Sequence, residues 1–348
     1  MEQDNVKMNS KNRNHYWLLI IALMMFVLPL CIKNIYTIHV FILIIFYAFL
    51  ASAWNILCGF VGELSLGHSA LLGIGGYTST LLFINYNISP WIGIFFGAVA
   101  AIIAAVIIGV PSFRLRGPYF ALTTIAFAEF LRIYIENHEI GPFGIPLKGA
   151  MGLLVPLHGN APGLFEFSNK IYYYYIILLA LFASTLITYI ITKKRLGYYL
   201  VAIRSNPDAA ESLGINIMKY KLTAIIISAA IISFGGTFYA QYFRYIGPTR
   251  TFGVALAVEI AVIGIIGGQG TVLGPLFGAF LVIPISEFLM SRFGGNLPGL
   301  HLFVYGLVLM IVILFIPKGI HDPFVNLLNK VEENFLDLFR PKKNNNKI

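Results

Sequence analysis

Charged side chains interrupt several long apolar runs of this sequence, and they are the residues most able to do chemistry. Glu129 and Arg132, in FAEFLRIY, are three residues apart, so on a helix they share one face and can form an ion pair. Glu259, in LAVEIAVIG, has no oppositely charged residue near it in the sequence. A charge inside a bilayer is costly and usually faces protein or water. We favour a structural role for the Glu129–Arg132 pair, whereas Glu259 is compatible with a hydrogen bond between helices, a place on a polar pathway, or proton relay.

A glycine-rich stretch carries two further ionisable residues. Residues 59–80, GFVGELSLGHSALLGIGGYTST, contain Glu63 and His68. On a helix the small residues of this stretch would fall on one face: Gly62, Ser65, Ser69, Gly73 and Gly76. Small residues let helix backbones approach closely in lipid, so we interpret the stretch first as a packing face. A helix that breaks beside a pathway is compatible with the same residues. Glu63 lies near a membrane edge, where water can solvate it, and a lone histidine such as His68 usually has a packing role.

The second half of the chain repeats this pattern. In GGQGTVLGPLFGAF, residues 267–280, the glycines Gly270, Gly274 and Gly278 are four residues apart and would form a second packing face. The order Gly-Glu-Leu-Ser at residues 62–65 parallels Gly-Gln-Gly-Thr at residues 268–271. The parallel suggests an internal duplication, which is a common design of transporters.

A polar, basic loop at residues 192–220 contains a short helix signal. In RSNPDAAESLGINI, Asn206 is placed to cap a helix, Pro207 suits the first helical position, and Asp208 lies near the positive end of the helix dipole. Gly214 can end the helix in a left-handed conformation. Such a helix either rests on the membrane surface or docks on a soluble partner. The candidate docking residues are Asn206, Pro207, Asp208, Ala209, Ala210, Glu211 and Gly214.

No motif for nucleotide hydrolysis or hydrolytic catalysis occurs in the sequence. It contains no GxxxxGK[ST] phosphate loop, no HExxH and no GxSxG. The histidines are scattered, and Cys31 and Cys58 form neither a disulfide framework nor a metal motif. We therefore expect no enzymatic activity, no cofactor and no metal site.

The elements that position these residues are membrane-spanning helices. Of the 348 residues, 58% are hydrophobic and 11% are charged, whereas a soluble domain has about 25% charged residues. The apolar runs are continuous, as in helices, and do not alternate as in a β-barrel. We expect an all-α, polytopic helical membrane protein with about ten transmembrane helices. The predicted spans are residues 16–33, 36–57, 63–84, 91–110, 118–136, 171–191, 221–240, 253–267, 271–290 and 300–317.

The placement of lysine and arginine predicts the sidedness of the spans. Most of the 24 basic residues lie before the first span, between the fourth and fifth spans, in the 192–220 loop, or after the last span. Basic residues concentrate on the cytoplasmic side, which places both termini in the cytoplasm. The chain then divides into a cytoplasmic segment (1–15), a transmembrane domain (16–317) with a cytoplasmic loop (192–220), and a basic cytoplasmic tail (318–348). This sidedness explains the net charge of +9 without a nucleic-acid partner.

Four ordered motifs between about residues 40 and 317 resemble one family. They are WNILCGFVGELSLGHSALLGIGGY, RLRGPYFALTTIAFAEFLR, NPDAAESLGINIMKYKLTAIIISAAIISFGGTFYA and GGQGTVLGPLFGAF. The chain resembles the LivM-type permease of branched-chain amino-acid ABC importers. Asp208, Ala209, Ala210 and Gly214 also resemble the EAA-x-x-x-G coupling loop of ABC permeases, with aspartate in place of glutamate. Two positions depart from the family pattern: Glu63 replaces a usual glutamine, and Lys148-Gly149-Ala150 replaces a common Thr-Gly-Gly.

The resemblance implies a multi-subunit importer in a plasma or inner membrane. A LivH-type second permease would complete the pore, and two cytoplasmic ATPase subunits would dock on the coupling helices. An extracytoplasmic solute-binding protein would deliver leucine, isoleucine or valine. ATP-driven closure of the ATPases would switch the pore between inward-open and outward-open states, and the resemblance favours docking on a soluble partner for the 206–214 helix.

Three alternatives remain open at this point. Permeases similar to this one move urea or other small amides and acids, because the binding protein largely determines the solute. A proton-coupled secondary transporter could use Glu259 as its relay. A structural membrane scaffold would show no solute transport at all.

Overall fold

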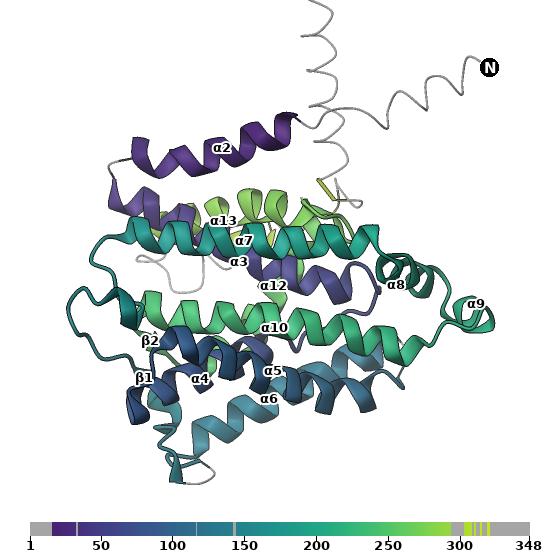
Figure 1. The fold of residues 1–348 in the computed structure, drawn as a ribbon, viewed down its shortest axis with the longest axis horizontal. Coiled ribbons are helices and arrows are strands. Elements are labelled where there is room, and N and C mark those ends of the chain that lie inside the picture. The colour runs from purple at the N-terminus through teal and green to yellow at the C-terminus, as the bar shows by residue number, and fades with distance from the viewer. Residues whose placement is uncertain are drawn as a thin grey trace, which may run out of the picture.

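The computed structural model describes residues 16–32, 34–115, 117–141 and 144–293, together with residues 303–307, 310, 314, 319 and 320. Long helices run side by side along one axis (Figure 1). The helices are α2 Tyr16–Cys31, α3 Ile35–Cys58, α4 His68–Tyr86, α5 Pro90–Ser112, α6 Pro118–Asn137, α7 Lys170–Lys193, α8 Arg195–Ser205, α9 Pro207–Ser212, α10 Ile217–Phe243, α11 Pro248–Thr251, α12 Val254–Gly268 and α13 Gly274–Phe293. The short strands β1 (Leu153–Leu154) and β2 (Tyr245–Ile246) form an antiparallel pair.

The predicted helical, polytopic architecture is confirmed, but the predicted number of spans is not. Six segments of the described residues are long and apolar enough to cross a membrane: Ile35–Cys58, Pro90–Ser112, Lys170–Lys193, Ile217–Phe243, Pro248–Gly268 and Gly274–Phe293. The helices α4 and α6 are long enough but less apolar, because α4 is rich in glycine, serine and threonine and α6 carries charged residues. Helix α2 is apolar along its sequence, but its 16 residues are fewer than the roughly 20 that a spanning helix needs. The predicted span 300–317 lies mostly outside the described residues, as do the predicted segments 1–15 and, but for residues 319 and 320, 318–348.

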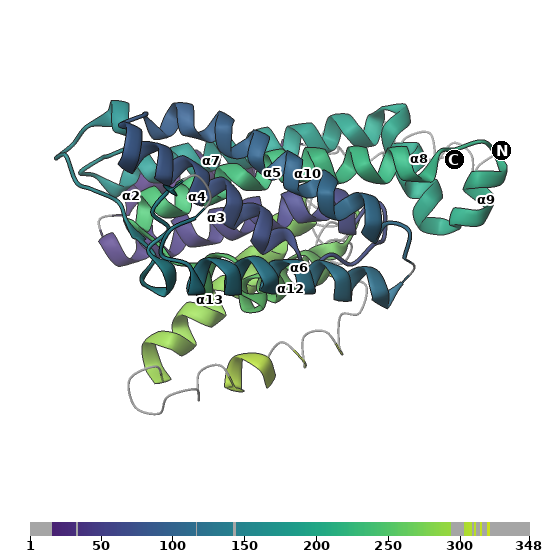
Figure 2. The same cartoon turned by 90° about the horizontal axis from the view of Figure 1, so that it is seen from below.

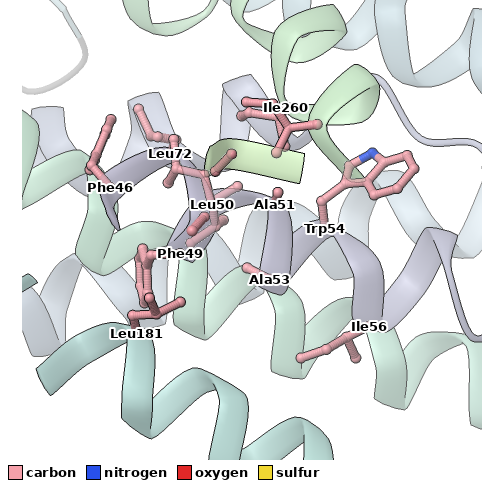
Figure 3. Close-up of a cluster of buried hydrophobic side chains, with 14 of the residues drawn as sticks. Phe46, Phe49, Leu50, Ala51, Ala53, Trp54, Ile56, Leu72, Leu181 and Ile260 are labelled. Atoms are coloured by element: carbon pink, nitrogen blue, oxygen red, sulfur yellow. The ribbon is translucent and has the colours of Figure 1, made fainter. Parts of the chain in front are cut away.

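The centre of the molecule is α3, a helix that is apolar on all sides. Of its apolar stretch 83% is buried, against 33% in α5, and helices α7, α10, α12 and α13 pack around it. Ile42, Leu50 and Trp54 are fully buried, and Figure 3 shows Leu50 and Trp54 among the side chains of this core. A helix that is hydrophobic on every face belongs in the interior, so α3 is the central helix against which the other spans pack.

Glycine contacts join α4 to α5 and α10, as the predicted packing face requires. A Cβ atom added to Gly76 would lie 2.7 Å from the Gly236 carbonyl oxygen of α10, and one added to Gly97 of α5 would lie 2.7 Å from the Gly75 carbonyl oxygen. Gly73 packs against the ring of Phe252. Backbones that approach this closely leave no room for side chains, and such contacts stabilise helix pairs in lipid.

The predicted helix 63–84 begins later than expected, so the five-residue face was partly wrong. The helix starts at His68. Gly62 adopts a left-handed φ of +84°, and the Trp54 indole Nε1 donates a hydrogen bond to the Ser65 carbonyl oxygen at 2.9 Å. These interactions hold residues 59–67 as an irregular connection, which supports the alternative of a helix that breaks. Gly62 and Ser65 therefore lie before the helix, and only Ser69, Gly73 and Gly76 lie on it.

A similar correction applies to the second glycine face. The helix predicted over 271–290 begins at Gly274, and Gly270 lies in the preceding connection with a left-handed φ of +76°. Gly274 and Gly278 do lie on α13, where Gly274 meets Gly267 of α12, and Gly278 meets the Ile263 carbonyl oxygen. The expected close contact is therefore made by two of the three predicted glycines, together with Gly267.

The two ends of the helix bundle differ. At one end, α8 and α9 project beyond the other helices (Figures 1 and 2); we call this the α9 end. At the other end, the loop of residues 138–169 packs against the end of α10 through the β1–β2 pair; we call this the loop end. Glu166 secures this loop by accepting hydrogen bonds from the backbone N–H groups of His158 and Gly159, at 2.8 and 3.1 Å.

Candidate functional site

The short helix predicted from the sequence is present at the α9 end. Asn206 caps α9 by accepting a hydrogen bond from the Ala209 N–H at 3.0 Å, and Pro207 occupies the first helical position. Ala210 is the buried residue of α9, and it faces the molecule. Gly214 has a left-handed φ of +82°, the conformation in which glycine commonly ends a helix. The exposed side of α9 carries Asp208, Ala209 and Glu211.

A cleft of about 610 Å³ lies beside α9 and contains an ion pair. Its walls include Glu211 of α9, Arg114 after α5, and Glu63 in the connection before α4. Lys221 of α10 donates to the Glu63 carboxylate, and its side chain is 8% exposed. A buried ammonium requires such a partner. The departure from the family pattern at Glu63 therefore supplies the partner of Lys221, which ties the connection before α4 to α10.

The two glycine-rich connections lie side by side at the α9 end. Asn55 of α3 donates through Nδ2 to the Thr271 carbonyl oxygen at 2.8 Å and accepts from the Gly270 N–H at 2.9 Å. Arg204 of α8 donates to the Gly59 carbonyl oxygen at 2.6 Å. Sequence reasoning missed Asn55 and Arg204 as site residues. An amide in the apolar run AWNILC was the only signal for Asn55, and no local signal pointed to Arg204.

His68 joins three helices through a buried chain of hydrogen bonds. The Ser228 hydroxyl of α10 donates to the Ala53 carbonyl oxygen of α3 at 2.6 Å, so its oxygen accepts from His68 Nε2 at 2.9 Å. The Ser65 hydroxyl then donates to His68 Nδ1, 3.0 Å away. This assigns a neutral imidazole with its proton on Nε2. His68 and Ser65 are buried in this structure, where their hydrogen bonds position α4.

The predicted ion pair of α6 is present and belongs to a larger network. Arg132 donates from Nε to Glu129 and from Nη1 to Glu136, both at 2.7 Å. Glu136 also accepts from the Thr249 hydroxyl of α11 at 2.8 Å. Glu136 was missed from the sequence, although its four-residue spacing from Arg132 is the signal that could have found it.

Glu259 is not part of this network. It is half-buried on α12, and the Tyr47 hydroxyl of α3 lies near its carboxyl group. This proximity is compatible with the expected role of Glu259 in contacts between helices. Across the part of the chain that the structure describes, no three His, Cys, Asp or Glu side chains form a cluster that could hold a metal ion.

Comparison with known proteins identifies the class of membrane protein to which this chain belongs. The family described as "Branched-chain amino acid transport system / permease component" matches residues 36–313. The chain belongs to this family. The permease is 29% identical to the high-affinity branched-chain amino acid transport system permease protein LivM of Escherichia coli, over 82% of this chain and 69% of LivM.

Other relatives broaden the range of solutes. The permease is 25% identical to the nucleoside ABC transporter permease protein NupC of Lactococcus lactis, over 74% of this chain and 85% of NupC. It is 24% identical to the permease protein LivH of the Escherichia coli branched-chain amino acid system, over 79% of this chain and 90% of LivH. No solved structure matches the chain. The relatives named here are transport permeases and not enzymes.

Proposed function

We propose that this permease forms one half of the membrane pore of an ABC importer for leucine, isoleucine and valine. The observation that supports the proposal most is the capped, projecting helix α9 in a chain of this family. The carboxylates of Asp208 and Glu211 lie on the exposed side of α9, where a soluble partner would dock. The sequence contains no phosphate loop with which the chain itself could hydrolyse ATP. Two separate ATPase subunits would supply the driving force by docking on α9 and on its counterpart in a LivH-type second permease.

The contacts around α9 offer a route by which movement could reach the spans. Helix α9 follows α8 directly, and Arg204 of α8 binds the Gly59 carbonyl oxygen in the connection before α4. The same connection is bound to α10 through Glu63 and Lys221. Movement of α9 would therefore act on α4 and α10 together, the two helices that meet at glycine contacts. Close-packed elements move as rigid bodies between discrete arrangements.

The sidedness follows from the same assignment. If α9 meets ATPases, the α9 end lies in the cytoplasm and the loop end faces the extracytoplasmic binding protein. The basic residues agree with this orientation, because Lys193, Lys194 and Arg195 lie at the junction of α7 and α8, at the α9 end. Both chain termini would then be cytoplasmic.

Charge reversal on α9 tests the proposal. We expect the double variant D208K/E211K to lose most of the stimulation of ATP hydrolysis by solute-loaded binding protein, because ammonium groups would replace the two carboxylates on the surface that docks on the ATPase. The complex of permeases, ATPases and binding protein is measured in nanodiscs, and T223A, on an exposed part of α10, serves as the control. Unchanged stimulation in a folded D208K/E211K complex would contradict the assignment of α9.

The solute is tested with the cognate binding protein. Because one relative is a nucleoside permease, leucine and a nucleoside such as uridine are compared by isothermal titration and by stimulation of ATP hydrolysis. We expect leucine, isoleucine and valine to bind and to stimulate. Binding of the nucleoside alone would contradict the amino-acid assignment and leave the importer assignment in place.

A further inference from the structure

Helix α6 carries a charged stripe at membrane depth. It runs roughly parallel to α5 and α10 in Figure 2 and is tilted relative to them in Figure 1, and its 20 residues correspond to about 30 Å, the thickness of a bilayer core. Glu129 and Arg132 lie about 17 and 21 Å along α6 from Pro118, and Glu136 lies about 27 Å along it. The ion pair is therefore close to the middle of the layer that the apolar helices cross.

These charged side chains are only partly covered by the rest of the chain. The exposed fraction of the side chain is 31% for Glu129, 26% for Arg132 and 20% for Glu136. Lipid on this surface would desolvate the two charges of the Glu129–Arg132 pair and provide no polar contact, which is costly even for a paired group. The stripe therefore requires water or another protein beside it.

The opposite case is seen on α5, whose exposed face is wholly apolar. Phe95, Val99, Ile103 and Ile107 are each more than half exposed, and they repeat at the spacing of one helical face. This is the surface expected against lipid. On α6 the exposed side chains of Leu122, Phe130 and Ile133 are also apolar, so what distinguishes α6 from α5 is the half-buried charged stripe that flanks this exposed face.

The helices beside the stripe belong to the same face of the molecule. Thr249 of α11 binds Glu136, and α12 packs next to α6, as Figure 2 shows. The exposed side of α12 carries small or apolar residues such as Ala255 and Val258. The charged stripe is thus the polar edge of a surface formed by α6 and α12, which no other described element covers.

We propose that the stripe Glu129–Arg132–Glu136 lines the water-filled pathway where this chain faces the second permease. The inference rests on the proposed function, because it takes the second permease as the partner that encloses the pathway. Water in the pathway solvates the exposed parts of the three charges, and the partner excludes lipid from them. The ion pairs fix α6 and α11 relative to each other while the stripe remains in contact with water.

Thiol labelling tests the inference in the assembled complex. In a C31S/C58S background, single cysteines replace Ile125, which is four residues before Glu129 and on the same face of α6, and Ile103 on the apolar face of α5. The probe is a membrane-impermeant, charged methanethiosulfonate. We expect Ile125→Cys to react at least about tenfold faster than Ile103→Cys, because a charged reagent and a thiolate both need water. The two variants are matched, since each replaces an isoleucine and keeps all three charged residues.

The outcomes separate the inference from the proposed function. Equal, slow labelling of both cysteines overturns the inference. Reaction of Ile125→Cys with a lipid-soluble maleimide would then show that this face of α6 contacts lipid. A disulfide from Ile125→Cys to the second permease would instead show a dry contact between the two permeases. ATP hydrolysis stimulated by leucine-loaded binding protein is measured on the same Ile125→Cys complex before labelling. If the C31S/C58S complex without the added cysteine also shows no stimulation of ATP hydrolysis, the result counts against the proposed function. The labelling rates of the two cysteines would still show whether water reaches the stripe.

Discussion

His68 links three helices, although in the sequence it is a lone histidine near the end of a predicted span. Its partners Ser65 and Ser228 are 3 and 160 residues away. The nearer partner has a helical spacing, but Ser65 lies outside the helix, so the contact depends on the irregular connection. The farther partner depends on how α4 and α10 cross. A sequence shows neither feature, so the role of His68 required the structure.

Replacement of His68 by phenylalanine is expected to lower stability by about 2 kcal/mol, because buried hydroxyl groups of Ser65 and Ser228 lose a partner. Thermal unfolding in detergent provides the measurement, and His68→Asn should retain part of the stability because its amide can replace one hydrogen bond. The matched control is His138→Phe at an exposed position. A melting temperature equal to that of the unchanged protein would contradict the role of His68.

Helices were easier to predict than the connections between them. Continuous apolar runs identify α3, α5, α7 and α10 because a spanning helix needs about 20 such residues. The starts of α4 and α13 were placed too early, because left-handed glycines and the bonds made by Trp54 and Asn55 hold the preceding residues out of the helix. The caps of α9 are local, so Asn206 and Gly214 could be identified from sequence. The contacts of Arg204 and Lys221 join distant segments and could not.

The crossing of α4 and α10 makes Gly236 intolerant of any side chain. A Cβ atom there would lie 2.0 Å from the Leu72 carbonyl oxygen and 2.6 Å from the Gly76 nitrogen, both backbone atoms. We expect Gly236→Ala to destabilise the protein by about 3 kcal/mol, because the helices must move apart. Gly163→Ala is the control, since no atom lies within 4 Å of its Cβ position. Equal yields of monodisperse protein and equal melting temperatures for the two variants would refute this contact.

The 138–169 loop is expected to loosen in acid through Glu166. Burial raises the pKa of this carboxyl, but the N–H groups of His158 and Gly159 and the charge of Arg244 outweigh burial, so the pKa is lowered. A lowered pKa in the folded state gives stability that is present above the unfolded value of about 4.3 and is lost as pH falls through the folded value. Hydrogen exchange of the loop should rise below about pH 4. In Glu166→Gln this pH dependence should disappear, and its persistence would exclude Glu166 as the cause.

At the scale of the whole molecule, the permease combines a buried apolar core with polar contacts at the α9 end, on α6 and at the loop end. The core around α3 holds the spans together. The α9 end has an exposed helix connected to α4 and α10, α6 carries the charged stripe, and the loop end has a hydrogen-bonded loop. This distribution fits a subunit that is moved by a partner at one end and meets a second subunit along α6.

Transport by reconstituted liposomes tests the central claim, that the permease conducts solute only when separate ATPases drive it. Radiolabelled leucine uptake is compared between liposomes with the permease alone under an imposed pH gradient and liposomes with the second permease, the ATPases, binding protein and ATP. We predict accumulation against a gradient only in the complete system, with none when ATP is replaced by a non-hydrolysable analogue. Leucine accumulation by the permease alone, driven by the pH gradient, would contradict the account.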